Sequence, residues 1–291
     1  MKAETLPSNP GLLLRIAQFP LTRIVVLGAG LYLLLGVKNG FRAQFASAPW
    51  MALAVVAAMS ALGLAVYAAF VRFVERRAVS ELSLPGMGRE LGLGLLVGAV
   101  LYTLCVLILM LLGNYQIIRL NPWSFMLPAV SMALGSGVFE ELVYRGVLFR
   151  VVEESLGSWI SLLVSSLVFG IAHLHNENAT LIGALSISVE AGLLLAGAYM
   201  LTRRLWMSIG FHFAWNFTQS GIFSGNVSGN DTGQGLIQAS VQGSDWLTGG
   251  SFGLEASLVA LLVGTATGVM FLILAARRGH VIVPFWKRKP G

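Results

Sequence analysis

Long apolar segments recur along almost the whole chain, and they restrict its fold more than any other feature. The hydrocarbon core of a bilayer is crossed by about 20 apolar helical residues. Segments of about that length each predict a membrane-spanning helix, and eight occur, near residues 20–37, 49–72, 90–113, 123–147, 157–175, 180–202, 205–223 and 253–276. The sequence therefore predicts an all-α polytopic integral membrane protein with about eight transmembrane helices, folded as a single membrane domain over residues 1–291.

The first segment is the shortest, because Lys38 ends it early. A cleaved signal peptide is the alternative for this segment, since Ala46, Ser47 and Ala48 resemble a cleavage site. That site lies well beyond the apolar stretch, however, and further apolar segments follow it. We therefore interpret residues 20–37 as a membrane helix.

Composition agrees with a bilayer environment. Of the 291 residues, 56% are hydrophobic and 11% are charged, whereas a soluble domain has about 25% charged residues. A soluble enzyme and a disordered chain are thereby excluded. The net charge of +6 does not indicate a nucleic-acid partner, because the charges lie at the ends of the apolar segments. Cys105 is the single cysteine, so no internal disulfide can form, and the 34 glycines favour closely packed helices.

Lys and Arg are divided unequally between the two sides that eight spans would create. One side holds sixteen of them, and the other holds only three, Lys38, Arg42 and Arg119. Cytoplasmic segments carry the excess of Lys and Arg, so we expect both termini to be cytoplasmic. The basic residues 287–289 are then expected to lie against anionic lipid. The loop 224–252 has no Lys or Arg and is rich in Gly, Ser and Asn, which predicts a flexible external connection.

Ionisable side chains inside membrane helices are costly and are therefore candidates for function. The predicted spans contain few of them, namely Glu140, Glu141, His173, Glu190 and His212. The polar residue Asn216 lies one helical turn after His212. The tryptophans Trp206, Trp215 and Trp246 are interpreted as interface or packing residues.

Counting from a turn predicts that two of these residues meet. Gly157 suits the break between two antiparallel helices, and Ser158 suits the following N-cap. Glu140 lies sixteen residues before Leu156, and His173 lies sixteen residues after Gly157. The two side chains should therefore sit at the same depth. The helix with His173 would then end inside the bilayer, so its polar continuation at 175–178 would need protein or a water-filled cavity around it.

Helical spacing assigns faces to the remaining polar residues. His212 and Asn216 are four residues apart and share a face, as do Phe169 and His173. Glu140 and Glu141 point about 100° apart, so we expect one to take part in chemistry and the other to anchor the network. Arg145 lies one turn after Glu141 and can pair with it.

These residues together resemble the motif set of the CPBP family, which includes the CAAX prenyl endopeptidase Rce1 and Abi-type bacteriocin-immunity proteins. The motifs are Glu140-Glu141-x-x-x-Arg145, Phe169-x-x-x-His173 and His212-x-x-x-Asn216, and their core region spans about 123–223. The resemblance implies an Rce1-like bundle of eight helices, an intramembrane endopeptidase activity and an active site reached from the cytoplasm. It further implies a bacterial plasma membrane and a membrane-associated protein or peptide as substrate.

The resemblance also implies roles for single residues. Glu140 would activate water with help from His173, and His212 and Asn216 would stabilise the oxyanion. Arg145 and Phe169 are expected to support the site. Glu190 lies outside the three motifs, and we expect it to support the site by lining the same cavity or pairing with a polar neighbour. The family is often labelled as metalloprotease, and Glu140, His173 and His212 could hold Zn²⁺. No H-E-x-x-H motif is present. The sequence does not distinguish a catalytic water bound to a metal ion from one activated by glutamate alone. We favour the mechanism without a metal ion.

Two other functions remain open at this stage. A non-catalytic scaffold or bacteriocin self-immunity factor could use the same fold. A proton-coupled transporter could also bury Glu and His, although the chain shows no inverted repeat and its polar groups gather in one half.

Overall fold

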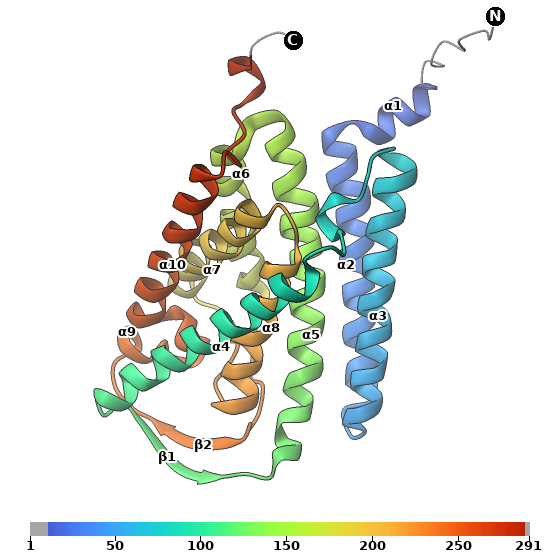
Figure 1. Cartoon of the computed structure of the whole chain (residues 1–291). Coiled ribbons are helices and arrows are strands. Elements are labelled where there is room, and N and C mark those ends of the chain that lie inside the picture. The colour runs from blue at the N-terminus through green and yellow to red at the C-terminus, as the bar shows by residue number, and fades with distance from the viewer. Residues whose placement is uncertain (1–10, 289–291) are drawn as a thin grey trace, which may run out of the picture.

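The computed structural model describes residues 11–288, so Lys2 and Lys289 of the predicted charge pattern lie outside the described part. The chain folds as an all-α polytopic membrane protein with one small two-stranded sheet (Figure 1). Its main elements are α1 (Leu12–Gln18), α2 (Pro20–Gln44), α3 (Pro49–Ala69), α4 (Met87–Leu111), β1 (Tyr115–Leu120), α5 (Leu127–Glu141), α6 (Arg150–Ala172), α7 (Leu181–Thr202), α8 (Trp206–Phe217), β2 (Ile237–Val241), α9 (Asp245–Thr248) and α10 (Leu258–Arg277).

Six helical stretches within residues 11–288 are long and apolar enough to cross a membrane. One of them, Trp123–His175, contains two of the predicted segments, because the helix reverses at Gly157 without an intervening coil. The helix around α8 continues only to Ile222 and is too short to qualify. The membrane fold is confirmed, and the count of eight crossings stays a prediction.

The turn at Gly157 has the predicted backbone but not the predicted cap. Gly157 has φ +79°, a left-handed conformation that glycine adopts without steric cost. The hydroxyl of Ser158 does not cap the next helix. It donates to Glu153 Oε1 and accepts from the amide of Ile282, so this turn is fixed by the C-terminal segment.

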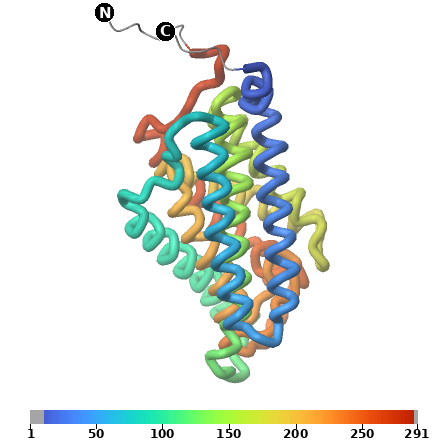
Figure 2. The backbone as a smooth tube through the Cα atoms, turned by 90° about the vertical axis from the view of Figure 1, so that its right-hand side faces the viewer, coloured from blue at the N-terminus to red at the C-terminus, as the bar shows by residue number. Residues whose placement is uncertain are grey.

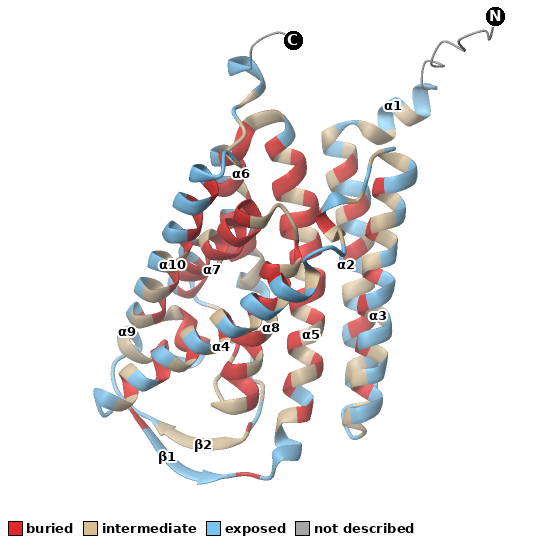
Figure 3. Cartoon of the chain, viewed as in Figure 1, coloured by how far each residue is buried: buried red, intermediate tan, exposed pale blue. Residues whose placement is uncertain are grey.

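Exposed apolar side chains cover the outer faces of the bundle, and the polar groups lie inside. Leu33 on α2, Leu96 on α4 and Leu262 on α10 all point outward and are exposed. Figure 3 shows the same division, with buried residues concentrated where α5, α6, α7 and α8 meet. This pattern fits helices whose outer faces are solvated by lipid.

Two further features place the site. In Figure 2, α2 and α3 stand side by side against the helix that runs from α5 to the turn at Gly157, and both ends of the described chain lie at the same end of the bundle. At the opposite end, β1 and β2 pair antiparallel, with Tyr115 opposite Val241. The prediction of a flexible loop at 224–252 is therefore wrong, because its backbone groups bond to β1 and to residues 176–178.

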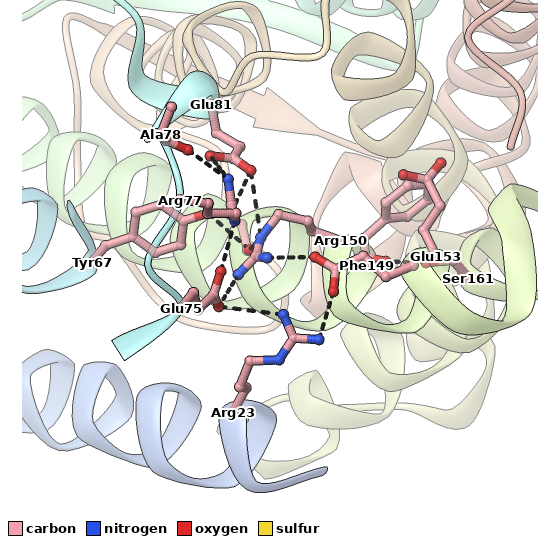
Figure 4. A network of polar contacts seen from close by, with 12 residues as sticks. Arg23, Tyr67, Glu75, Arg77, Ala78, Glu81, Phe149, Arg150, Glu153 and Ser161 are labelled. Atoms are coloured by element: carbon pink, nitrogen blue, oxygen red, sulfur yellow. Dashed lines mark hydrogen bonds and ion pairs between the residues drawn. The ribbon is translucent and has the colours of Figure 1, made fainter. Parts of the chain in front are cut away.

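An ionic network joins the helices near the chain termini (Figure 4). Arg150 bonds to Glu75 and Glu154, and Arg23 of α2 contacts the same two carboxylates. Burial alone would raise the pKa of Glu75, but the hydrogen bonds and charges of Arg150 and Arg77 bring that pKa below its usual value. The network fixes the start of α2 to α6, while the other end of α2 borders the cavity described next.

Candidate active site

A cavity of about 550 Å³ lies between α2, α5, α7 and α8. Its wall includes Glu140, His173, His212 and Asn216, together with Phe169. Three segments far apart in the sequence thus supply the polar groups that the motifs singled out. Their predicted convergence at one depth is observed.

Glu140 lies between two imidazoles. Its Oε2 atom is 3.9 Å from His173 Nε2 and 3.8 Å from His212 Nε2. These separations exceed a hydrogen bond, so the three groups face a common point without bonding directly to one another. Within residues 11–288, Glu140 Oε2 is buried and has no hydrogen-bond partner. A water molecule between the three groups would be within reach of all of them.

The other nitrogen of each imidazole is held by the protein. His173 Nδ1 lies 2.6 Å from the carbonyl oxygen of Phe169, which can only accept, so Nδ1 carries the proton. His212 Nδ1 bonds to Glu141 Oε1 at 2.9 Å. Both rings therefore turn Nε2 toward Glu140, and the spacing of four residues between Phe169 and His173 produces one of the two bonds.

Glu141 lies behind His212 and is absent from the cavity wall. It is fully buried and bonds to Arg145 Nη1 at 2.8 Å as well as to His212. Arg145 also donates to the carbonyl of Ala191 in α7, and its guanidinium lies 4.6 Å from the ring centroid of Phe169. The adjacent glutamates thus divide as the helical geometry predicted, with Glu140 on the cavity and Glu141 anchoring the network.

A π-helical segment, Leu142–Phe149, follows Glu141 directly. Such wide turns interrupt α-helices most often at functional sites. Arg145 belongs to this segment and contacts Glu141, which bonds to His212. No property of the sequence predicted the wider turn.

The polar loop after His173 is held by the long loop on one side, while His175 and Glu177 are exposed. Asn176 donates to the carbonyl of Ser228 at 2.6 Å, and Asn178 donates to that of Gly229.

Asn216 donates to Ser136 Oγ at 3.0 Å and also borders the cavity. Trp215 is a cavity residue too, so its interpretation as mere packing was incomplete.

Sequence reasoning missed two buried charged residues of the cavity wall. Lys38, which was expected to end the first helix, is buried within a helix that continues to Gln44, and its ammonium lies against Gly135. Glu255 precedes the last helix and accepts hydrogen bonds from Ser228 and Trp215. Neither residue carries a spacing signal, because each meets the site through segments remote from the motifs.

The cavity lies toward the end of the bundle opposite the chain termini. Its wall includes Asn39 and Arg42 late in α2, Pro128 early in α5, and residues 230–232 of the long loop. If the termini are cytoplasmic, the cavity opens toward the outer side. The two expectations of cytoplasmic termini and cytoplasmic entry therefore conflict.

The site chemistry only partly suits a metal ion. Two imidazoles with fixed Nδ1 atoms and one carboxylate form a donor set that Zn²⁺ accepts. Within residues 11–288, however, no three His, Cys, Asp or Glu side chains are close enough to hold a metal ion together.

Comparison with known proteins identifies the part of the chain that carries these residues. Residues 122–218 match the family described as type II CAAX prenyl endopeptidase Rce1-like. This region is Rce1-like. The resemblance indicated by the three motifs is thereby confirmed, and the Rce1-like region contains all three. The match covers about a third of the chain, and no curated protein or solved structure matches it.

Proposed function

We propose that the protein is an intramembrane endopeptidase that hydrolyses membrane-associated protein or peptide substrates. The observation that carries this proposal is the position of Glu140 Oε2, less than 4 Å from both Nε2 atoms on one cavity wall. The match of this region to a family of CAAX prenyl endopeptidases supports the same reaction class.

In the proposed reaction, Glu140 accepts a proton from water as the water oxygen bonds to the peptide carbonyl carbon. His173 orients that water through Nε2, since its Nδ1 is occupied by Phe169. The C–N bond then breaks, and the proton held by Glu140 passes to the leaving amine. No acyl-enzyme forms along this route.

His212 and Asn216 supply donors to the developing oxyanion. For His212 to donate from Nε2 while Nδ1 donates to Glu141, the ring must be an imidazolium. The Glu141 carboxylate stabilises that charged ring, so Glu141 acts as a positioning residue. Asn216 uses one amide hydrogen for Ser136 and keeps the other for the substrate.

Hydrolysis by the full-length protein in nanodiscs tests the proposal. Glu140→Gln should reduce cleavage of a peptide library by about 10²–10⁴-fold, because it removes the base. Glu177→Gln is the matched control, since Glu177 lines the same cavity but is exposed. Equal rates for Glu140→Gln and the unsubstituted protein would refute the assignment.

Metal removal distinguishes the two forms of this mechanism. We propose that the water is activated without a metal ion, because the spacing of the three groups does not fit one. Dialysis against 1,10-phenanthroline should leave the rate unchanged. A loss of activity that added Zn²⁺ restores would instead favour a metalloprotease.

A further inference from the structure

Two glutamates on the cavity wall lie outside the three motifs and play no part in the reaction described above. Glu190 comes from the middle of α7, and Glu255 comes from the segment before α10. Both are almost fully buried, at 3% and 4% exposed. Among residues 11–288, no Lys or Arg forms an ion pair with either carboxylate.

Glu255 is held as a hydrogen-bond acceptor. Its Oε2 accepts from the amide and the hydroxyl of Ser228, at 2.6 and 2.9 Å, and its Oε1 accepts from Trp215 Nε1 at 3.2 Å. Burial raises the pKa of Glu255 above its usual value, and the donated hydrogen bonds oppose part of that shift. The same Ser228 accepts from Asn176, three residues after His173, and Trp215 lies between His212 and Asn216 on α8. Glu255 is therefore fixed directly beside the residues that surround Glu140.

Glu190 has no such donors. Its Oε2 atom is buried without a hydrogen-bond partner in the described part of the chain. Its side chain passes over Gly264 of α10, where an added Cβ would collide with Glu190 Cγ. Gly264 thus leaves room for a buried carboxyl group that borders the cavity.

A buried carboxylate without a donor or a cation is costly, and a ligand that supplies both lowers that cost. We propose that Glu190 and Glu255 form a subsite for a lysine or arginine side chain of the substrate. The inference rests on the proposed function, because it assigns a preference to the same cavity. A cationic side chain would donate hydrogen bonds to Glu190 and would favour the ionised forms of both carboxyl groups. The cations that α2 contributes to the cavity wall, Lys38 and Arg42, would repel the same side chain and so favour one orientation of the peptide.

Cleavage of paired peptides tests this subsite. Full-length protein in nanodiscs is given a peptide library in which each position carries either lysine or norleucine. The unsubstituted protein should prefer lysine at one position, and Glu190→Gln should reduce that preference by about 10- to 100-fold through KM. Glu190→Asp keeps the charge and should restore part of the preference. Glu177→Gln, which removes an exposed carboxylate of the same cavity, should leave it unchanged.

A binding measurement separates failure of the subsite from failure of the enzyme. Glu140→Gln protein is titrated with the lysine and norleucine peptides by fluorescence anisotropy, with and without Glu190→Gln. Weaker binding of the lysine peptide alone on loss of Glu190 supports the subsite even if no peptide is hydrolysed. Equal binding of both peptides, or an unchanged preference in Glu190→Gln protein that unfolds at the normal temperature, would overturn the proposal.

Discussion

At the scale of single residues, the site depends on which nitrogen of each histidine is held by the protein. Phe169 O and Glu141 Oε1 occupy the Nδ1 atoms, so both Nε2 atoms are left for the cavity. Glu141 is in turn held by Arg145, and both side chains are buried. A single buried ion pair thus supports the orientation of His212. Removing either partner should lower both the stability of the protein and its rate of hydrolysis.

The variant Arg145→Met should lower the free energy of unfolding by about 3–5 kcal/mol, because it removes the guanidinium bonded to the buried Glu141 carboxylate and leaves His212 as its one remaining partner. Combining it with Glu141→Gln should recover part of this loss, since no uncompensated charge remains. Hydrolysis should stay at least about 100-fold below normal in the double variant, because His212 has lost its carboxylate. Thermal unfolding in detergent and peptide cleavage measure the two effects. A double variant with normal cleavage would limit Glu141 to a structural role.

At the scale of elements, small residues set the position of the helix that carries His212. An added Cβ at Gly98 of α4 would lie 2.6 Å from the carbonyl oxygen of Phe211, and one at Gly210 of α8 would lie 2.5 Å from that of Leu91. The backbones of α4 and α8 therefore touch, as the abundance of glycine predicted. His212 directly follows Phe211, so the crossing of these two helices fixes the depth of its ring.

Gly98→Ala should separate α4 from α8 and displace His212. We expect a loss of about 1–3 kcal/mol in stability from the forced contact, together with reduced hydrolysis. Gly92→Ala is the matched control on the same helix, because nothing lies within 4 Å of an added Cβ there. The control should be neutral or slightly stabilising. Similar unfolding temperatures for the two variants, measured under the same conditions, would argue against a tight crossing.

The helices and strands also show which parts of the fold the sequence could predict and which it could not. Counting outward from Gly157 placed Glu140 beside His173, because two straight helices that share a turn keep their residues in register. The π-helical turn around Arg145, the sheet between β1 and β2, and the burial of Lys38 were not predicted. These features arise from contacts between remote segments, which neither hydropathy nor helical spacing records. Glu255 was missed for the same reason, since its donors come from the loop 224–252 and from α8.

At the scale of the whole molecule, two groups of charged side chains lie toward opposite ends of the bundle. The network of Arg23, Arg77 and Arg150 with its carboxylates lies at the end that carries the chain termini. The cavity reaches toward the other end, where Asn39 and Arg42 border it. If the first end is cytoplasmic, as the excess of Lys and Arg predicts, a substrate would approach the cavity from the outer side.

Labelling with a membrane-impermeant maleimide tests that orientation. Cys105 is buried and is the single native thiol, so Cys105→Ala provides the background. Asn39→Cys places a thiol at the exposed cavity end of α2, and Ser80→Cys places one at an exposed position beside the ionic network. In intact cells, Asn39→Cys should react and Ser80→Cys should react only after permeabilisation. The reverse pattern would put the termini outside and the cavity toward the cytoplasm, where the resemblance to Rce1 placed its entrance, and the positive-inside argument for this chain would then be wrong.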